Sequence, residues 1–417
     1  MRILGSYIRD ITALQWCAML TAFLIPCFRK MVALGIALMA LACIAEAMKK
    51  GRRLSLRLNA SAWLMLAIFA LHIVGLNFAE SIDQGMKEIE IKLSYFIFPL
   101  LMFFGFATKR TQKIQIAAAF VLGCLLRIPI SLADAWTLYA ETGNIKAWSY
   151  EMLSEPYHPS YMALYQGFSL LLMLCYFYNE QISRGRQIFV LTAMSCTLIY
   201  ISMLASRAGL ISAVFFIVIA GLLFWHSATN RLERIFLTGA CLVVLIASSL
   251  LLPTTSQRIE ALNIASVRSQ TTETAPAPAK KSSVAMRQIS WESAWEVLLH
   301  NPMGVGTGDA EKALVNEYIR RNENSAATKK LNAHNQILQL GVEFGWLGIL
   351  LLLGLFVFLC RAAYQQKQWI MCAILGVFFL NCLVESMLEV QAGIVFFAYL
   401  TILIGPPAPM RMKDELL

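Results

Sequence analysis

The chain has 417 residues, of which 58% are hydrophobic and only 14% are charged. These proportions exclude two or three soluble domains, because such domains carry about a quarter charged residues. The formal net charge of +10 does not indicate nucleic-acid binding, since the cations are spread over many short segments instead of one soluble face. The composition predicts an all-α polytopic membrane protein.

Apolar runs of about 17 to 25 residues bounded by charges predict about twelve transmembrane helices. We expect them near residues 8–28, 31–48, 60–78, 91–107, 114–136, 159–178, 187–204, 208–226, 235–252, 336–360, 368–386 and 391–405. The chain then divides into nine spans in 1–252, a polar loop with amphipathic helices in 253–335, and three spans with a short tail in 336–417. No cleavable signal is evident at the start, so the first span is expected to remain as an anchor.

Lysine and arginine fall unevenly on the two sides of these spans. With a cytoplasmic N-terminus, the short outside loops hold only Arg29, Lys30, Lys87, Lys146 and Arg207. Because cytoplasmic loops retain Lys and Arg, both termini are predicted to be cytoplasmic and the loop 253–335 periplasmic. We therefore expect a multi-pass protein of a bacterial inner membrane, surrounded by membrane lipids.

The ten cysteines lie in or beside predicted spans, and the polar loop contains none. This distribution does not indicate a disulfide framework or a thiolate metal site. We expect neither a metal nor another cofactor.

The fifth predicted span contains Arg127 and Asp134, which lie about two helical turns apart on one face. A central Arg costs roughly 2.5 to 3.5 kcal/mol on insertion scales and normally faces a cavity or a partner. Arg127 is therefore a candidate for binding substrate, and a buried structural Arg–Asp pair is the alternative. Pro129 between them is expected to kink the helix.

The sequence YHPSYMAL brings His158 and Tyr161 into the outer end of the sixth predicted span. A lone His at such a place is more often a hydrogen-bonded helix cap than a functional group. Both interpretations stay open, and both residues are candidates for contacting substrate.

The sequence MLASRAGLISAV joins the seventh and eighth spans so tightly that Ser206 and Arg207 must lie at the outer edge of the bilayer. No Asp or Glu lies nearby in the sequence to pair with Arg207. Ser206 can cap the eighth helix, which would leave N–H groups and a positive dipole end beside the guanidinium. Such a site suits an anion, and a phosphate above all.

Residues 267–283, rich in Pro, Ala, Thr and Lys, indicate a mobile segment. Helical periodicity returns at Val284, where a stripe predicts an amphipathic helix on the membrane interface. The stripe contains Arg287, Trp291, Trp295 and Leu298. Asn301 and Pro302 are expected to end this helix. The sequence GVGTG that follows indicates tight turning with close approach of a ligand, before a helix capped by Asp309.

His334 and Asn335 stand where the loop enters the tenth span, and Glu343 lies two turns further along. A neutral imidazole at this place can accept a proton from a hydroxyl near neutral pH. Glu385 and Glu389 lie near the outer end of the eleventh span, where we expect them to pair with the arginines.

These pieces, taken together, resemble a known family. SRAG with Arg207, RxxxW with Arg287, NPMGVGTG, and AHNQILQLGVEFGWLG with His334 are similar to motifs of the O-antigen ligase and polymerase superfamily, bacterial membrane glycosyltransferases of the GT-C class. The resemblance covers roughly residues 190–350. In length, number of spans and the HN pair, the chain most resembles the ligases that join O-antigen to the lipid A core.

The resemblance implies transfer of O-antigen from an undecaprenyl diphosphate donor to a sugar hydroxyl of the lipid A core, with inversion and without metal or nucleotide. Arg207 and Arg287 would neutralise the diphosphate leaving group, and His334 would activate the acceptor hydroxyl. The other candidates are expected to bind substrate: Arg127, His158, Tyr161, Ser206 and Asn335.

Two alternatives stay open. An O-antigen polymerase or a protein O-oligosaccharyltransferase would share the donor chemistry and differ in the acceptor. A membrane transporter is the alternative of another class, since intramembrane Arg127 and Asp134 would also suit a substrate pathway. Against transport, the sequence shows no inverted repeat and no matched pair of broken spans.

Overall fold

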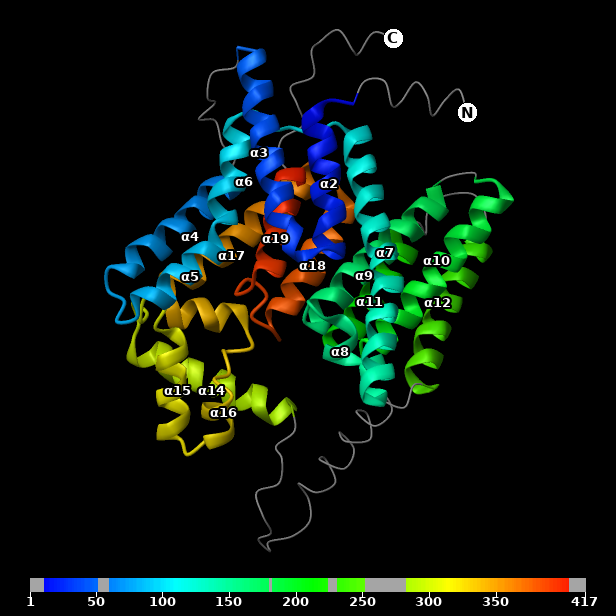
Figure 1. Cartoon of the computed structure of the whole chain (residues 1–417). Coiled ribbons are helices and arrows are strands. Elements are labelled where there is room, and N and C mark those ends of the chain that lie inside the picture. The colour runs from blue at the N-terminus through cyan, green and yellow to red at the C-terminus, as the bar shows by residue number, and fades with distance from the viewer. Residues whose placement is uncertain (1–10, 52–59, 180–181, 224–230, 252–282, 405–417) are drawn as a thin grey trace, which may run out of the picture.

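The computed structural model describes residues 11–51, 60–179, 182–223, 231–251 and 283–404, and every regular element within them is a helix (Figure 1). Helices at the predicted spans are α2 (Ala13–Cys27), α3 (Val32–Lys49), α4 (Ala60–Leu76), α6 (Ser94–Phe103), α7 (Arg110–Thr142), α9 (Pro159–Asn179), α10 (Arg184–Met203), α11 (Arg207–Leu223), α12 (Arg231–Leu251), α17 (Gln336–Gln365), α18 (Trp369–Cys382) and α19 (Gln391–Ile404). Short turns η1 (Arg29–Met31), η2 (Ile145–Trp148) and α8 (Tyr150–Ser154) join some of them.

The helix composition is that of a multi-pass membrane protein. Among the described residues, five helical segments are long and apolar enough to cross a membrane, and six more apolar helices are shorter. The all-α fold class is thus confirmed, whereas the number of twelve crossings and the GT-C class stay predictions. The mobile segment expected at 267–283 falls almost wholly outside the described residues.

The fourth predicted span, 91–107, begins differently in the structure. Another helix, α5 (Ile82–Lys92), lies between the third predicted span and α6. It is joined to α6 at Leu93. The helix α7 continues through Pro129 from Arg110 to Thr142 without an interruption. α2, α9 and α10 therefore pack against one continuous helix.

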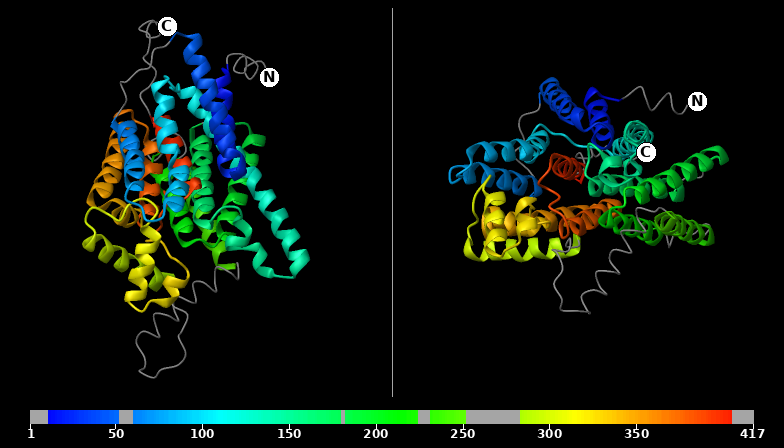
Figure 2. Two further views of the ribbon diagram at one scale, coloured as in Figure 1. Left: turned by 60° about the vertical axis from the view of Figure 1, so that its left-hand side comes forward. Right: turned by 60° about the horizontal axis from the view of Figure 1, so that its bottom comes forward.

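The polar part of the chain forms a small helical bundle at one end of the membrane helices (Figures 1 and 2). It consists of α14 (Ser283–His300), α15 (Ala310–Arg320) and α16 (Asn324–Thr328). The bundle has its own apolar core, which includes Ala294, Leu314 and Tyr318 and reaches Val342 on α17. Val342 therefore ties the core of the bundle to α17.

The helix α17 is interrupted where the sequence predicted an unbroken run into the membrane. Phe344 (φ −132°) and Gly345 (φ 61°, ψ −151°) leave the helical conformation. The carbonyls of Val342 and Glu343 accept hydrogen bonds from Val305 and Gly306, both at 2.9 Å. The break thus separates a polar first part of α17, up to Glu343, from the apolar part that follows.

Residues 302–309, which we name the glycine-rich strap, fill this break. The carbonyl of Pro302 accepts from the Trp346 N–H at 3.2 Å, and a Cβ on Gly345 would lie 1.9 Å from the same oxygen. Gly304, with φ of 84°, packs on the Glu343 carbonyl, whose oxygen would lie 2.3 Å from a Cβ at this position. The glycines serve backbone-to-backbone packing in this structure, where the sequence suggested approach of a ligand.

The far end of the strap is bound to α4 and α5. Thr307 donates to the His72 carbonyl at 2.7 Å, and the Gly308 N–H donates to Glu88 at 2.8 Å. Asp309 stands before α15, but its carboxylate accepts the N–H groups of Glu80 and Ser81 and makes no capping bond to α15. The expected cap of α15 therefore stabilises the start of α5 instead.

Candidate active site

His334 lies at the turn that leads into α17. Its backbone has a φ of 45°, a region that non-glycine residues adopt rarely and mostly at special sites. Its N–H donates to the Asn332 side chain at 3.0 Å. Trp291, on α14, donates its indole N–H to the His334 carbonyl, also at 3.0 Å. The backbone of His334 is thus held from the loop before it and from the bundle helix beside it.

Asn335 caps α17, and this fixes the direction in which His334 leaves the helix. Its side-chain oxygen accepts the N–H groups of Ile337 and Leu338 at 2.9 and 3.1 Å. Its amide nitrogen donates to the carbonyl of Leu383 at 3.0 Å. Both polar atoms of the Asn335 side chain are thus bonded within the chain. The contact of Asn335 with substrate stays a prediction.

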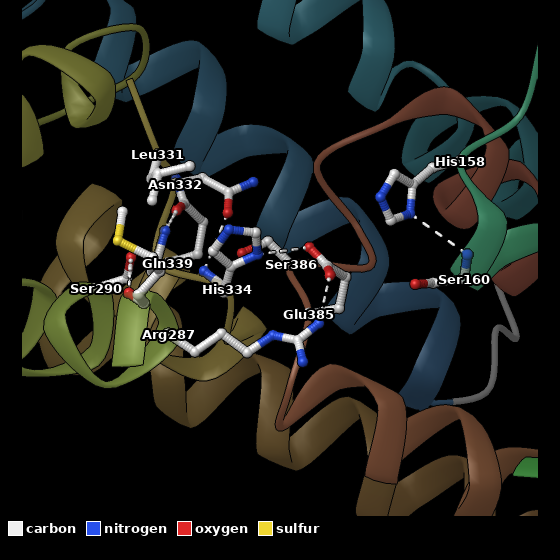
Figure 3. A network of polar contacts seen from close by, with 12 residues as sticks. His158, Ser160, Arg287, Ser290, Leu331, Asn332, His334, Gln339, Glu385 and Ser386 are labelled. Atoms are coloured by element: carbon white, nitrogen blue, oxygen red, sulfur yellow. Dashed lines mark hydrogen bonds and ion pairs between the residues drawn. The ribbon is translucent and has the colours of Figure 1, made fainter. Parts of the chain in front are cut away.

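Glu385 brings His334 and Arg287 together (Figure 3). It lies in residues 383–390, which connect α18 to α19 and which we name the α18–α19 connection. The Nδ1 atom of His334 lies 2.9 Å from Glu385 Oε1, and the Nη2 atom of Arg287 lies 3.5 Å from Glu385 Oε2. One carboxylate therefore bridges the predicted base and one predicted diphosphate-binding arginine.

The exposure of these side chains suits a reacting site at the edge of the protein. Glu385 is 9% exposed, whereas His334 and Arg287 are 24% and 26% exposed. Burial on its own would raise the pKa of Glu385, but the hydrogen bond with His334 and the nearby positive charges hold that pKa below its usual value. Glu385 is therefore ionised at neutral pH, and His334 donates its Nδ1 proton to it.

His158 faces this group from the start of α9 (Figure 3). Burial lowers the pKa of its imidazole, and the carboxylates of Glu385 and Glu151 oppose that shift only in part. The Ser160 N–H donates to His158 Nδ1 at 3.4 Å. A neutral His158 with its proton on Nε2 thus lies within electrostatic reach of Glu385 and can offer a hydrogen-bond donor to a ligand.

Ser206 and Arg207 are placed as the sequence predicted for a capped helix start. The Ser206 hydroxyl accepts the Gly209 N–H at 3.2 Å and lies 3.3 Å from the Ser160 hydroxyl. Arg207 donates to the hydroxyl of Ser283, the first residue of α14, at 3.2 Å. Arg287 follows one turn later on α14, so both predicted diphosphate-binding arginines border the first turn of this helix.

Arg127 and Tyr161 lie behind this group, inside the protein. Arg127 is 4% exposed. It forms an ion pair with Asp134 at 3.6 Å, donates to the Glu155 carbonyl, and lies over the Tyr157 ring. The structure thus contains an Arg127–Asp134 pair, but only Arg127 is buried, since the side chain of Asp134 is 62% exposed. Arg127 also holds the segment that leads to His158.

Tyr161 is 5% exposed, and its hydroxyl donates to the Ser386 carbonyl at 3.2 Å. It therefore supports the residue next to Glu385. For both Arg127 and Tyr161, direct contact with substrate stays a prediction that their burial does not favour.

The sequence reasoning missed two buried ionisable residues beneath this group, His72 on α4 and Lys92 at the end of α5. They are 0% and 1% exposed. The only available signal was their type, since each is a polar residue in or beside an apolar run. Among the described residues, no group of three or more His, Cys, Asp or Glu is arranged to hold a metal ion.

Comparison with known families assigns the central part of the chain. Residues 190–353 match the family described as O-antigen ligase. This central segment is similar to the O-antigen ligase family. The matched segment contains Arg207, Arg287 and His334, and it coincides with the region of the resemblance seen in the sequence. The search of curated proteins finds no match.

The matched segment ends before Glu385. Its three predicted catalytic residues come from α11, α14 and the turn before α17, and the carboxylate that connects two of them comes from outside the matched residues. His158, which precedes the match, completes the group. A family of this kind implies lipid-linked glycan substrates.

Proposed function

We propose that the protein ligates O-antigen polysaccharide from undecaprenyl diphosphate onto the lipid A core oligosaccharide at the periplasmic face of a bacterial inner membrane. The observation that carries this proposal is the bridge from His334 through Glu385 to Arg287, with separations of 2.9 and 3.5 Å. It supports the proposal because it brings an imidazole and a guanidinium from the segment similar to the O-antigen ligase family to one carboxylate.

His334 acts as the base for the acceptor hydroxyl. With Nδ1 donating to Glu385, the lone pair of the neutral ring is on Nε2, and this atom takes the proton of the acceptor hydroxyl. The ionised Glu385 fixes that tautomer and stabilises the imidazolium that forms, as the carboxylate does in a Ser-His-Asp triad. Positioned general bases contribute typically about 10²- to 10⁴-fold in rate.

The deprotonating oxygen attacks the anomeric carbon of the donor from the face opposite the diphosphate. A bond forms between that oxygen and the anomeric carbon while the bond from carbon to the diphosphate oxygen breaks with its electron pair, so the configuration inverts. Arg207 and Arg287 bind the leaving diphosphate and neutralise its developing charge. Since the guanidinium of Arg287 is 26% exposed, it retains N–H donors for the ligand while touching Glu385.

An O-antigen polymerase is the second candidate function. The same base and the same arginines would serve it, because the donor is the same and only the acceptor hydroxyl differs. The family match supports this candidate as well, since the domain covers glycan transfer by ligases and polymerases alike.

The deciding experiment gives the purified full-length protein undecaprenyl-linked O-antigen together with rough lipopolysaccharide. We expect polysaccharide to appear on the lipopolysaccharide, with and without a chelator. Lengthening of the undecaprenyl-linked glycan instead, with the lipopolysaccharide unchanged, would identify a polymerase. Absence of both products, under conditions in which donor binds, would contradict glycan transfer.

A further inference from the structure

A fully buried lysine lies beneath the candidate active site. Lys92, at the end of α5, is 1% exposed. Its ammonium donates to the Leu388 carbonyl at 2.6 Å and to Glu389 Oε2 at 2.8 Å. Both acceptors belong to the α18–α19 connection, the segment that carries Glu385. Lys92 therefore anchors the α18–α19 connection to the end of α5.

The same carboxylate reaches the start of α17. Gln336 is 0% exposed. Its amide nitrogen donates to Glu389 Oε1 at 2.7 Å, and its amide oxygen accepts the Leu388 N–H at 2.5 Å. Gln336 lies two residues after His334, and Glu389 lies four residues after Glu385. Lys92, Gln336, Leu388 and Glu389, which we name the buried clamp, thus tie together the two chain segments whose side chains meet at the site.

A second chain of contacts reaches His334 from α4. His72 Nε2 lies 3.7 Å from Glu343 Oε2, and Glu343 Oε1 accepts from Gln339 at 2.8 Å. Gln339 in turn accepts the Ala333 N–H at 3.1 Å, directly before His334. The buried Gln339 therefore holds the backbone directly before His334, and His72 borders the carboxylate that accepts from Gln339.

Stability alone does not account for a charge pair in this place. Replacing a buried ion pair by well-packed apolar residues is often neutral or stabilising, because the desolvation penalty disappears. In some proteins such a pair instead selects one geometry, since its hydrogen bonds are lost when either partner shifts. A reacting group misplaced by about 1 Å can cost about 10²-fold in rate.

We propose that Lys92 is a positioning residue that, through Glu389 and Gln336, sets the hydrogen bond between His334 and Glu385. This inference rests on the proposed function for its consequence in catalysis. The consequence for geometry is independent of that function. Loss of the buried clamp separates the α18–α19 connection from the start of α17, so His334 Nδ1 loses its carboxylate acceptor and the tautomer is no longer fixed.

The test uses the full-length protein in lipid nanodiscs with ¹⁵N-labelled histidine, of which the chain has five. A His334→Gln variant assigns the low-field imidazole proton shared with Glu385. The double variant Lys92→Met/Glu389→Gln removes both charges of the ion pair together. Gln336→Met provides a second variant that cuts the link to α17 while keeping the Lys92–Glu389 ion pair.

The matched control is Gln166→Met. Gln166 is also 0% exposed and donates to the Cys124 carbonyl at 2.9 Å, so it joins α9 to α7 away from the buried clamp. We expect the His334 resonance to persist in this control and to be lost in both clamp variants. Persistence of the resonance in a folded clamp variant overturns the proposal.

Turnover supplies the second readout. In a protein with an intact His334, we expect the Lys92→Met/Glu389→Gln variant to lower kcat by about 10- to 100-fold. The donor KM should stay nearly unchanged, because Arg207 and Arg287 remain. In a His334→Ala background the same double variant should lower kcat by less than about twofold, since the effect acts through His334. An equal loss in both backgrounds overturns the positioning role. A wild-type protein that shows the resonance but transfers no glycan would contradict the proposed function, whereas the resonance in the clamp variants would still decide whether Lys92 sets the geometry.

Discussion

At the scale of single residues, His334 is expected to matter for turnover more than for binding. His334→Ala should lower kcat by about 10²-fold or more with the donor KM little changed, because the side chain acts on the acceptor hydroxyl and not on the diphosphate. His300→Ala is the matched control, since that exposed imidazole contacts only its own helix at Glu296. Initial rates with purified protein measure both, and near-normal turnover of His334→Ala would exclude a general base.

The two arginines are expected to require their guanidinium shape. Arg207→Lys and Arg287→Lys should each lower kcat/KM by at least about tenfold, because a lysine keeps the charge but loses bidentate contact with a diphosphate. Arg320→Lys is the control, since Arg320 lies on the exposed part of α15 and binds only Glu317 among the described residues. Full ligation by a Lys variant at normal membrane levels would show that charge alone is sufficient at that position.

Glu385 predicts a pH dependence of stability. Its pKa is below the usual value of a glutamate in the folded protein, so the unfolded chain binds its proton more readily and folding gains stability at higher pH. The contribution is fully present above the unfolded pKa and is lost as the pH falls through the lower folded pKa. We expect wild type to unfold at a higher temperature than Glu385→Gln at neutral pH and the difference to shrink below about pH 4.5.

Thermal unfolding of both proteins in the same detergent, measured from pH 7 downward, checks this expectation. A difference that grows on acidification would mean that Glu385 is protonated in the folded state and would contradict its role as acceptor for His334.

At the scale of elements, the sequence predicted most helices but few of their interruptions. Apolar runs identify a span because length and hydropathy are local properties. The break of α17 at Gly345 lies inside such a run, and nothing local marks it, since its carbonyls are satisfied by residues of the glycine-rich strap. The pairing of Arg287 with Glu385 was expected from charge, whereas the contact of His334 with Glu385, 51 residues away, has no signature in the sequence.

The break in α17 is expected to require glycine. Gly345→Ala places a Cβ 1.9 Å from the Pro302 oxygen and forces alanine into φ 61° and ψ −151°, which costs at least about 1 to 3 kcal/mol in backbone strain alone. Gly354→Ala on the same helix is the control, because its Cβ would meet only Leu64 side-chain atoms at 3.8 and 4.0 Å. Thermal unfolding should show a large loss for the first variant and almost none for the second. Equal stability of the two would mean that the strap does not depend on this close packing.

At the scale of the whole molecule, the bundle joins the membrane helices at the corner formed by α14, the strap and the break of α17. Trp295 and Trp346 lie edge to face with centroids 6.0 Å apart and are 43% and 45% exposed. Met303, on the strap, is 82% exposed. Trp346 begins the apolar part of α17, whose outward side chain Leu350 is 66% exposed and would face lipid. Tryptophans gather at membrane interfaces because their rings are apolar and their N–H groups are polar.

The stripe of α14 predicted contact with the membrane interface along the helix. We now expect that contact only at the C-terminal end of α14, since Leu298 is buried and Trp291 is turned toward His334. A benzoylphenylalanine introduced at Met303 should crosslink to lipid on irradiation in native membranes. The same group at Ile319, 56% exposed on α15, should not, because that helix lies farther from the membrane helices (Figure 1). Lipid capture at both positions would mean that the bundle lies deeper in the bilayer than expected. Capture at neither position would mean that the bundle does not contact the bilayer. Contact at the strap would set Arg287 near the depth of the headgroups, where the proposed lipid-linked diphosphate donor would bind.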